Sequence, residues 1–201
     1  MKKKIIAITG GIASGKSTFS AILRDLEQVV YDADKIYAEI IQDKSVILKI
    51  YELLGINIDF LGDGPVYFDR KLIADAVFND EKLLRKLNNF THKLVYEKIS
   101  EIAKSSKEPF IFFEVPLLFE SGGESLFDDV IIIMREKCER ILGAMIRSNL
   151  TEDEVLKRMS AQVDYDNLDK SLHTVISNNE GLCSLKIKAE KVIDYYKKQC
   201  M

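Results

Sequence analysis

Short apolar runs rich in β-branched residues alternate along this chain with longer stretches in which apolar residues recur every three or four positions. The short runs are typical of strands buried in a parallel sheet, and the longer stretches are typical of amphipathic helices. Strands are therefore expected at residues 4–9, 28–31, 110–113, 130–134 and 174–177. This alternation predicts an α/β fold, a three-layer sandwich built on a parallel five-stranded sheet.

Helical patterns dominate two further regions. A largely helical insert, at about residues 56–105, separates the second and third strands, as a lobe that closes over a second substrate would. Two later helical patterns, at residues 137–146 and 151–162, predict a helical lid at about residues 137–165. The second of them starts with a capping box, in which a threonine and a glutamate are three residues apart. All 201 residues are expected to form a single domain.

Residues 10–17 read GGIASGKS and connect the first strand to the first helical pattern. Glycines let such a loop fold around a phosphate chain, and the N–H groups at the start of the helix point at the anion. Lys16, exposed to solvent before ATP binds, is expected to reach the β- and γ-phosphates, and the Ser17 hydroxyl to ligate Mg²⁺. A glycine-rich turn that binds nothing is the alternative, and the strand and helix on either side argue against it. The expected ATP-binding residues of this loop are Gly11, Ile12, Ala13, Ser14, Gly15, Lys16, Ser17 and Thr18.

Acidic residues follow two of the expected strands. Asp32 and Asp34 come at the end of the second strand, where the period-2 alternation of a strand places them on the same side. Open α/β sheets bind ligands at this edge, although either aspartate could instead cap the helix that begins near Lys35. Glu114 ends the third strand, where it could hold a metal-bound water or lie on the surface.

Composition narrows the class of partners. A net charge of −3 argues against a general nucleic-acid-binding protein, although local Lys and Arg can still form a phosphate site. The three cysteines are far apart and have no C-x-x-C spacing, so neither a zinc site nor a disulfide framework is expected. The apolar run after Lys4 is shorter than that of a secretory signal, and no run approaches the roughly 18 residues of a membrane span. We expect a cytoplasmic protein without a nucleic-acid or membrane partner; its oligomeric state is open, with a monomer favoured.

Several classes of nucleotide-binding protein share the glycine loop. The N-K-x-D motif of regulatory GTPases does not occur, and the third strand lacks the Asp-Glu pair that is usual in ATPase motors. A small core with a helical lobe and an arginine-bearing lid indicates a small-molecule kinase, because phosphoryl transfer depends on positioning and charge neutralisation. Two alternatives remain: a kinase for another acceptor, such as a nucleoside, and a catalytically weak nucleotide-binding protein whose helical lobe serves a protein partner.

Further motifs give a more specific resemblance. TGGIASGKS at residues 9–17, DAD at 32–34, DR at 69–70, PLLFE at 116–120 and VISN at 175–178 closely resemble motifs of the dephospho-coenzyme A kinase family, and the resemblance extends over nearly the whole chain. It implies a P-loop kinase fold and transfer of the ATP γ-phosphoryl group to the ribose 3′-hydroxyl of dephospho-coenzyme A, the last step of coenzyme A synthesis. It also implies ATP and Mg²⁺ as cofactors and dephospho-coenzyme A as the small-molecule partner.

The resemblance implies roles for individual residues as well. Asp34 would activate the acceptor hydroxyl, with Lys16 and Arg147 as the other catalytic residues. Asp32 would contact the substrate and, with Ser17, hold Mg²⁺. Arg140 and Asn178 would join the ATP-binding residues, and Arg70, His92 and Leu117 would bind the acceptor.

Some of these roles have alternatives. The acceptor-binding histidine can equally be a hydrogen-bonded structural imidazole, and the acceptor-binding arginine can instead pair with a neighbouring carboxylate. Lys93, Gly143 and His173 depart from the family pattern, which usually has proline, arginine and aspartate at these positions. Arg140, one helical turn before Gly143, could compensate for the missing arginine.

Overall fold

The computed structural model describes residues 3–57, 66–78 and 80–200. The chain divides into two compact units, the first formed by Met1–Asp32 with Ala103–Met201 and the second by Ala33–Ile102. Each unit has a hydrophobic core of its own. Residues 58–65 of the expected helical insert lie outside the described residues.

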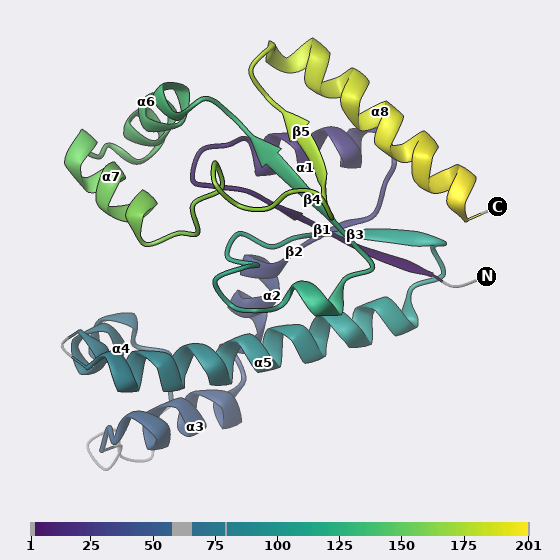
Figure 1. Ribbon diagram of the computed structural model, residues 1–201. Helices are drawn as coiled ribbons and strands as arrows, with labels where there is room; N and C mark the ends of the chain where they lie inside the picture. The colour runs from purple at the N-terminus through teal and green to yellow at the C-terminus, as the bar shows by residue number, and fades with distance from the viewer. Residues whose placement is uncertain (1–2, 58–65, 79, 201) are drawn as a thin grey trace. The chain divides into compact units, whose positions relative to one another are not determined.

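The first unit is built on a parallel sheet (Figure 1). Its strands are β1 (Lys4–Thr9), β2 (Val30–Asp32), β3 (Phe110–Glu114), β4 (Asp129–Met134) and β5 (Thr174–Ser177), with a short 3₁₀ helix, η2 (Glu124–Leu126), before β4. The order β2-β3-β1-β4-β5 places β1 in the centre, between β3 and β4. The α/β class and the parallel five-stranded sheet are thus confirmed, although the second strand starts at Val30 rather than at residue 28. Because parallel strands end at the same edge, the residues that follow β1, β3 and β4 meet there.

One face of this sheet is covered by α1 (Lys16–Asp25) and α8 (Gly181–Gln199), which contact each other (Figure 1). Phe112 on the sheet and Phe19 on α1 are fully buried, and Tyr196 on α8 is 1% exposed. Burying an aromatic or aliphatic side chain of this size contributes about 2 kcal/mol. This packing holds α1 firmly against the sheet, and α1 is the helix that directly follows the glycine loop.

Two helices follow β4: α6 (Lys137–Ser148) and α7 (Glu152–Ser160), which pack against each other. Asn149 ends α6 in the left-handed conformation, with φ 50°. The predicted capping box is confirmed, since the Thr151 N–H donates to Glu154 Oε2 at 2.8 Å and the Glu154 N–H donates to Thr151 Oγ1 at 3.4 Å. These bonds satisfy N–H groups that have no partner inside the helix, so the start of α7 is well defined.

The second unit is helical and consists of α2 (Ala33–Ile40), α3 (Lys44–Leu54), α4 (Arg70–Val77) and most of α5 (Glu81–Ser105). Its core includes the buried phenol of Tyr51. The Tyr51 hydroxyl donates to Tyr67 C=O at 2.6 Å and accepts the Asp69 N–H at 3.1 Å, which fixes the chain just before α4. None of the described helices is long and apolar enough to cross a membrane.

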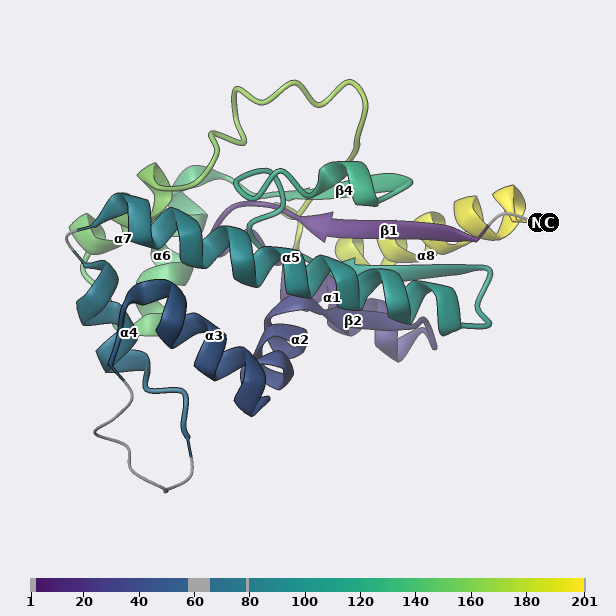
Figure 2. The same ribbon diagram turned by 90° about the horizontal axis from the view of Figure 1, so that it is seen from below.

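The beginning of β1 and the end of α8 lie side by side, as Figure 2 shows. Pro109 C=O accepts both the Lys4 N–H at 3.0 Å and the Cys200 thiol at 3.7 Å. The Lys4 ammonium also lies 6.0 Å from the centre of the Tyr196 ring. Both ends of the described chain are therefore held at the same place on the first unit.

Candidate functional site

The backbone of the glycine loop follows directly from its sequence. Gly10 has φ 144° and Gly15 has φ 100°, which are unfavourable for residues with a side chain. A Cβ on Gly10 would lie 2.3 Å from Ile133 C=O, and a Cβ on Gly15 would lie 2.1 Å from Asn178 Nδ2. Both positions therefore require glycine for conformation and for space.

Lys16 lies inside this loop and is 9% exposed, so the expectation of a solvent-exposed ammonium is wrong. The ammonium donates to Gly10 C=O at 2.6 Å and to Gly11 C=O at 2.9 Å. Burial lowers the pKa of Lys16 to about 8, and the positive charges of Arg147 and Arg140 add to this effect, while Glu114 opposes it. The lysine is thus held where an anion in the loop would replace its carbonyl partners.

A hydroxyl and a carboxylate that could hold a metal ion follow the lysine in the site. The Ser17 hydroxyl donates to Glu114 Oε1 at 2.6 Å. Glu114 is only 5% exposed, because β3 lies between β1 and β2. This burial excludes the surface alternative. In the strand register Glu114 is paired with Asp32, the last residue of β2. Mg²⁺ prefers oxygen ligands and usually takes only one or two carboxylates from the protein, so Ser17, Glu114 and Asp32 fit such a site.

Asp34 is placed differently from the prediction. β2 ends at Asp32 and α2 starts at Ala33, so Asp34 lies in the first turn of a helix, where the alternation of a strand does not apply. A carboxylate is favoured there by the helix dipole. Asp32 belongs to the first unit and Asp34 to the second.

Two of the expected acceptor-binding residues, Arg70 and His92, lie in the same unit as Asp34. Arg70 is the first residue of α4, directly after the cap Asp69, which accepts the N–H groups of the next turn. Burial raises the pKa of Tyr37 on α2, and the positive charge of Arg70 partly offsets this increase. Burial also lowers the pKa of His92 on α5, which favours the neutral imidazole. The third residue, Leu117, lies after β3 in the first unit and is 46% exposed.

Two arginines of α6 act on the glycine loop. Arg140 is 5% exposed, and its Nε donates to Ile12 C=O at 3.2 Å. A Cβ on Gly11 would lie 2.3 Å from the Arg140 guanidinium, so this glycine is needed for close contact. Arg147 is exposed. Its positive charge and the positive charge of Arg140 both lower the pKa of Lys16. The structure therefore places Arg140 in contact with the loop, and the charge of Arg147 also reaches Lys16.

The C-terminal end of the predicted lid adds contacts that the sequence did not indicate. Gln162 Oε1 accepts the Ile12 N–H at 2.8 Å, so side chains from both sides of the lid bind the two polar backbone groups of one loop residue. Glu120 Oε1 accepts the Val163 N–H at 2.8 Å. Gln162 was visible as the end of a helical pattern, but nothing in its sequence neighbourhood pointed to the loop.

The turn after β5 contacts the other side of the loop. Asn178 Nδ2 donates to Ser14 C=O at 2.9 Å, so Asn178, which was predicted to bind ATP, contacts the glycine loop. The Asn178 N–H donates to Met134 C=O at 2.8 Å and thereby continues the β4–β5 ladder. Thr18 is exposed in the first turn of α1. His173 contacts the ring of Phe119, with centroids 5.4 Å apart, and so has a packing role.

Proteins of one family are similar to this chain along nearly its whole length. A family model described as dephospho-CoA kinase matches residues 4–184. A curated dephospho-CoA kinase from Fusobacterium nucleatum is 34% identical over 192 residues, which cover 95% of this chain and 97% of that protein.

Solved structures share the fold. The crystal structure of TT1252 from Thermus thermophilus has a TM-score of 0.82 and 31% identity, covering 97% of this chain and 98% of that one. The dephospho-CoA kinase from Campylobacter jejuni has a TM-score of 0.73 and 29% identity, and the match covers 100% of both chains. The predicted kinase-type fold is confirmed by these matches.

Proposed function

The chain belongs to the dephospho-CoA kinase family, and from this premise we propose that it transfers the γ-phosphoryl group of ATP to the ribose 3′-hydroxyl of dephospho-coenzyme A. The product is coenzyme A, so this is the final step of its synthesis. One observation carries the proposal at the level of residues: Lys16 and Arg140 both bind backbone carbonyls of a single glycine loop, and the charge of Arg147 acts on Lys16.

The donor side of the reaction depends on these cations. The phosphates of ATP would replace Gly10 C=O and Gly11 C=O as partners of Lys16. The lysine then neutralises charge on the β- and γ-phosphates, and Arg147 stabilises the group in transfer, where electrostatic effects on the barrier are largest. Arg140 is already bound to the loop, so its contribution is to hold the loop in shape.

We propose Mg²⁺ as the metal, held by Ser17 and Asp32, with Glu114 as a further oxygen ligand or as the partner of a bound water. The 2.6 Å bond between Ser17 and Glu114 supports this arrangement, because it places a hydroxyl and a carboxylate together beside the loop. Bound Mg²⁺ would supply neutralisation of the phosphate charge.

The acceptor side is proposed to lie on the helical insert, at about residues 56–105, with Asp34 as the group that orients or deprotonates the 3′-hydroxyl. Arg70, His92 and Leu117 would bind the rest of dephospho-coenzyme A. The neutral state that burial favours for His92 suits a hydrogen-bonding role, and a purely structural imidazole stays the alternative. Residues at about 137–165 would act as the lid that excludes water during transfer.

We also propose a cytoplasmic location. Cys138, Cys183 and Cys200 are free thiols, which is common in reducing compartments. A monomer is the expected oligomeric state, and light scattering after size-exclusion chromatography measures it.

The decisive experiment is a panel of acceptors with Mg·ATP, in which ADP release is measured for dephospho-coenzyme A, adenosine and simple nucleotides. We expect dephospho-coenzyme A to stimulate ATP consumption far above the acceptor-free rate. Equal stimulation by adenosine or nucleotides would contradict the acceptor assignment and favour another small-molecule kinase. Tight ATP binding without turnover on any acceptor would favour a nucleotide-binding protein that serves a protein partner.

A further inference from the structure

One arginine beside the ATP site has no role in the function proposed above. Arg135 follows β4 directly, and its side chain is 32% exposed. One edge of its guanidinium is bound, because Nη2 donates to Glu139 Oε2 at 2.9 Å. The other edge reaches Gly143, since a Cβ built on that glycine would lie 3.6 Å from Arg135 Nη1.

Gly143 also lies against the glycine loop. The same Cβ position is 3.6 Å from Ala13 Cβ. Gly143 therefore leaves a flat strip of α6 between the loop and the guanidinium. Arg140, which was expected to compensate at this point, is instead bound to Ile12 C=O and packs on Gly11.

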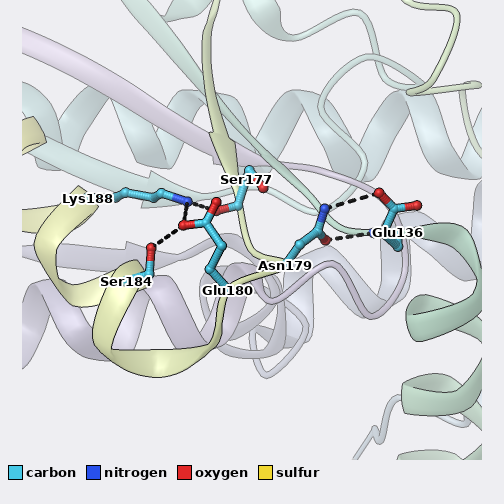
Figure 3. A network of polar contacts seen from close by, with 6 residues as sticks. All are labelled: Glu136, Ser177, Asn179, Glu180, Ser184 and Lys188. Carbon is cyan, nitrogen blue, oxygen red and sulfur yellow. Dashed lines mark hydrogen bonds and ion pairs between the residues drawn. The ribbon is translucent and has the colours of Figure 1, made fainter.

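The residue after Arg135 ties this region to the turn that follows β5 (Figure 3). The Glu136 N–H donates to Asn179 Oδ1 at 2.9 Å, and Asn179 Nδ2 donates to Glu136 Oε1 at 3.3 Å. The next residue of the turn, Glu180, accepts the Ser184 hydroxyl at 2.6 Å and the Lys188 ammonium at 3.0 Å. The bonds between Glu136 and Asn179 fix the backbone directly after Arg135.

The charges around Arg135 favour a flat, uncharged ligand over a phosphate. Two carboxylates, Glu136 and Glu139, flank the Arg135 guanidinium along the chain, and Glu139 is bound directly to it. The Glu139 carboxylate thus occupies one of the edges with which the Arg135 guanidinium would bind a phosphate. An arginine whose edge is bound by a carboxylate can still present its planar face to a ring, and guanidinium groups stack well on aromatic rings and nucleobases.

We propose that the guanidinium of Arg135 is a stacking platform for the base of the bound nucleotide, across the flat strip that Gly143 leaves beside Ala13. The proposal rests on the ATP site of the proposed function. It assigns to Arg135 the recognition of the base, while Lys16, Arg140 and Arg147 act on the phosphates and the loop.

Calorimetric titration without any acceptor tests this assignment, with ATP and inorganic tripolyphosphate as the two ligands. Arg135→Ala should weaken ATP binding by about 3- to 30-fold, the range of a cation–π contact, and should leave tripolyphosphate binding unchanged. Arg135→Lys should not restore ATP binding, because an ammonium has no planar face. Glu139→Gln is the matched control: it removes the ion pair, keeps the guanidinium, and should bind ATP as the wild type does.

Three outcomes would overturn the proposal while leaving the proposed function in place. Equal weakening of ATP and tripolyphosphate by Arg135→Ala would make Arg135 a phosphate ligand. Unchanged binding of both ligands would mean that Arg135 does not contact the nucleotide. Loss of ATP binding in Glu139→Gln to the same extent as in Arg135→Ala would mean that the ion pair only supports the structure. A wild-type protein that does not bind ATP would instead overturn the proposed function, and the platform with it.

Discussion

Lys16 is the residue of the glycine loop whose charge state is most perturbed by its surroundings. Its ammonium is bound by two loop carbonyls and is almost completely buried. Burial and two nearby arginines lower its pKa to about 8. Phosphate groups would have the opposite effect, because an anion within reach favours the charged form of the lysine.

The stability of the ligand-free protein should therefore depend on pH through this residue. The pKa of Lys16 is about 8 in the folded protein and 10.5 in the unfolded chain, so between these values the unfolded chain binds more protons and stability rises with pH. Below pH 8 both states are protonated, and the cost of burial is constant. Across this window we expect the unfolding free energy of the wild type to rise by about 3 kcal/mol relative to that of Lys16→Met. Urea unfolding of both proteins measures it, and a constant difference would contradict the lowered pKa.

ATP affinity should change with pH in the opposite direction. As the pH rises through about 8, the ligand-free lysine loses the proton that the phosphates require, so binding weakens and is accompanied by proton uptake. Calorimetry in two buffers with different ionisation enthalpies detects this uptake. Lys16→Met should show none of it, and its turnover should collapse.

Asp34 and Asp32 lie in different elements, which separates their expected effects. Asn keeps the size of the side chain but cannot accept the proton of the acceptor hydroxyl. Asp34→Asn should therefore lower kcat by about 10²–10⁴ and leave ATP binding nearly unchanged. Asp32→Asn should act through the metal, so that added Mg²⁺ restores part of its activity. If Mg²⁺ rescues Asp34→Asn and not Asp32→Asn, the two roles must be exchanged.

Individual residues differ in how far their sequence positions predicted their roles. The glycine loop could be predicted because the spacing of Gly10, Gly15 and Lys16 itself imposes the conformation, the close contacts and the charge. The choice between the two alternatives for Glu114, a metal-site role or a surface position, could not be made from sequence, since its burial depends on β3 having a strand on each side. Gln162 was missed for the same reason, because its contact with Ile12 joins residues 150 positions apart.

At the scale of elements, α6 supplies the two arginines of the proposed ATP site. Arg140 and Arg147 are seven residues apart, about two turns of a helix, and therefore lie on the same face. Arg140 is buried against the loop, whereas Arg147 is exposed at the last turn. The first is suited to a fixed structural contact and the second to a contact that forms when ATP is bound.

Arg147→Ala should accordingly reduce kcat more than it weakens ATP binding. Arginines that act on phosphoryl transfer contribute on the order of 10³–10⁵ in rate, and we expect the lower end or less because the charge of Arg140, which also reaches Lys16, stays in place. Steady-state kinetics and calorimetry with ATP separate the two effects. Arg158→Ala, which removes an exposed arginine near the end of α7, is the matched control. A change in the ATP dissociation constant alone would make Arg147 an anchor for the ground state.

The elements themselves were largely predictable, and the junction at residues 32–34 shows where prediction stopped. The apolar run before Asp32 correctly indicated a strand, which is half-buried and pairs with β3. The exact limits of this strand depend on its pairing with β3. On the β2 side this pairing starts at Val30. The helix that takes in Asp34 begins directly after the strand, and the strand pattern gave no sign of so short a connection.

At the scale of the whole molecule, the groups proposed for the two substrates fall mainly into separate units. The glycine loop and the arginines of α6 belong to the first unit, and Asp34, Arg70 and His92 belong to the second. Helical content alone predicted an insert, but the division at Ala33 depends on which helices share a core. Residues of α3, α4 and α5 bury their apolar side chains in one cluster. A local sequence pattern does not predict which helices pack together in this way.

The start of β1 and the end of α8 both bind the carbonyl of Pro109, which makes the chain suitable for circular permutation. Since Lys4 and Cys200 are held by the same carbonyl, a short glycine–serine linker can join the two ends without disturbing either. New ends can be opened at the exposed Glu27, in the turn after α1, which is at the far end of that helix from the loop. Such a circular permutant should keep its fold and its ATP affinity, as circular dichroism and calorimetry would measure. Loss of both would mean that β1 and α1 must be synthesised first, so that the rest of the sheet can assemble around them.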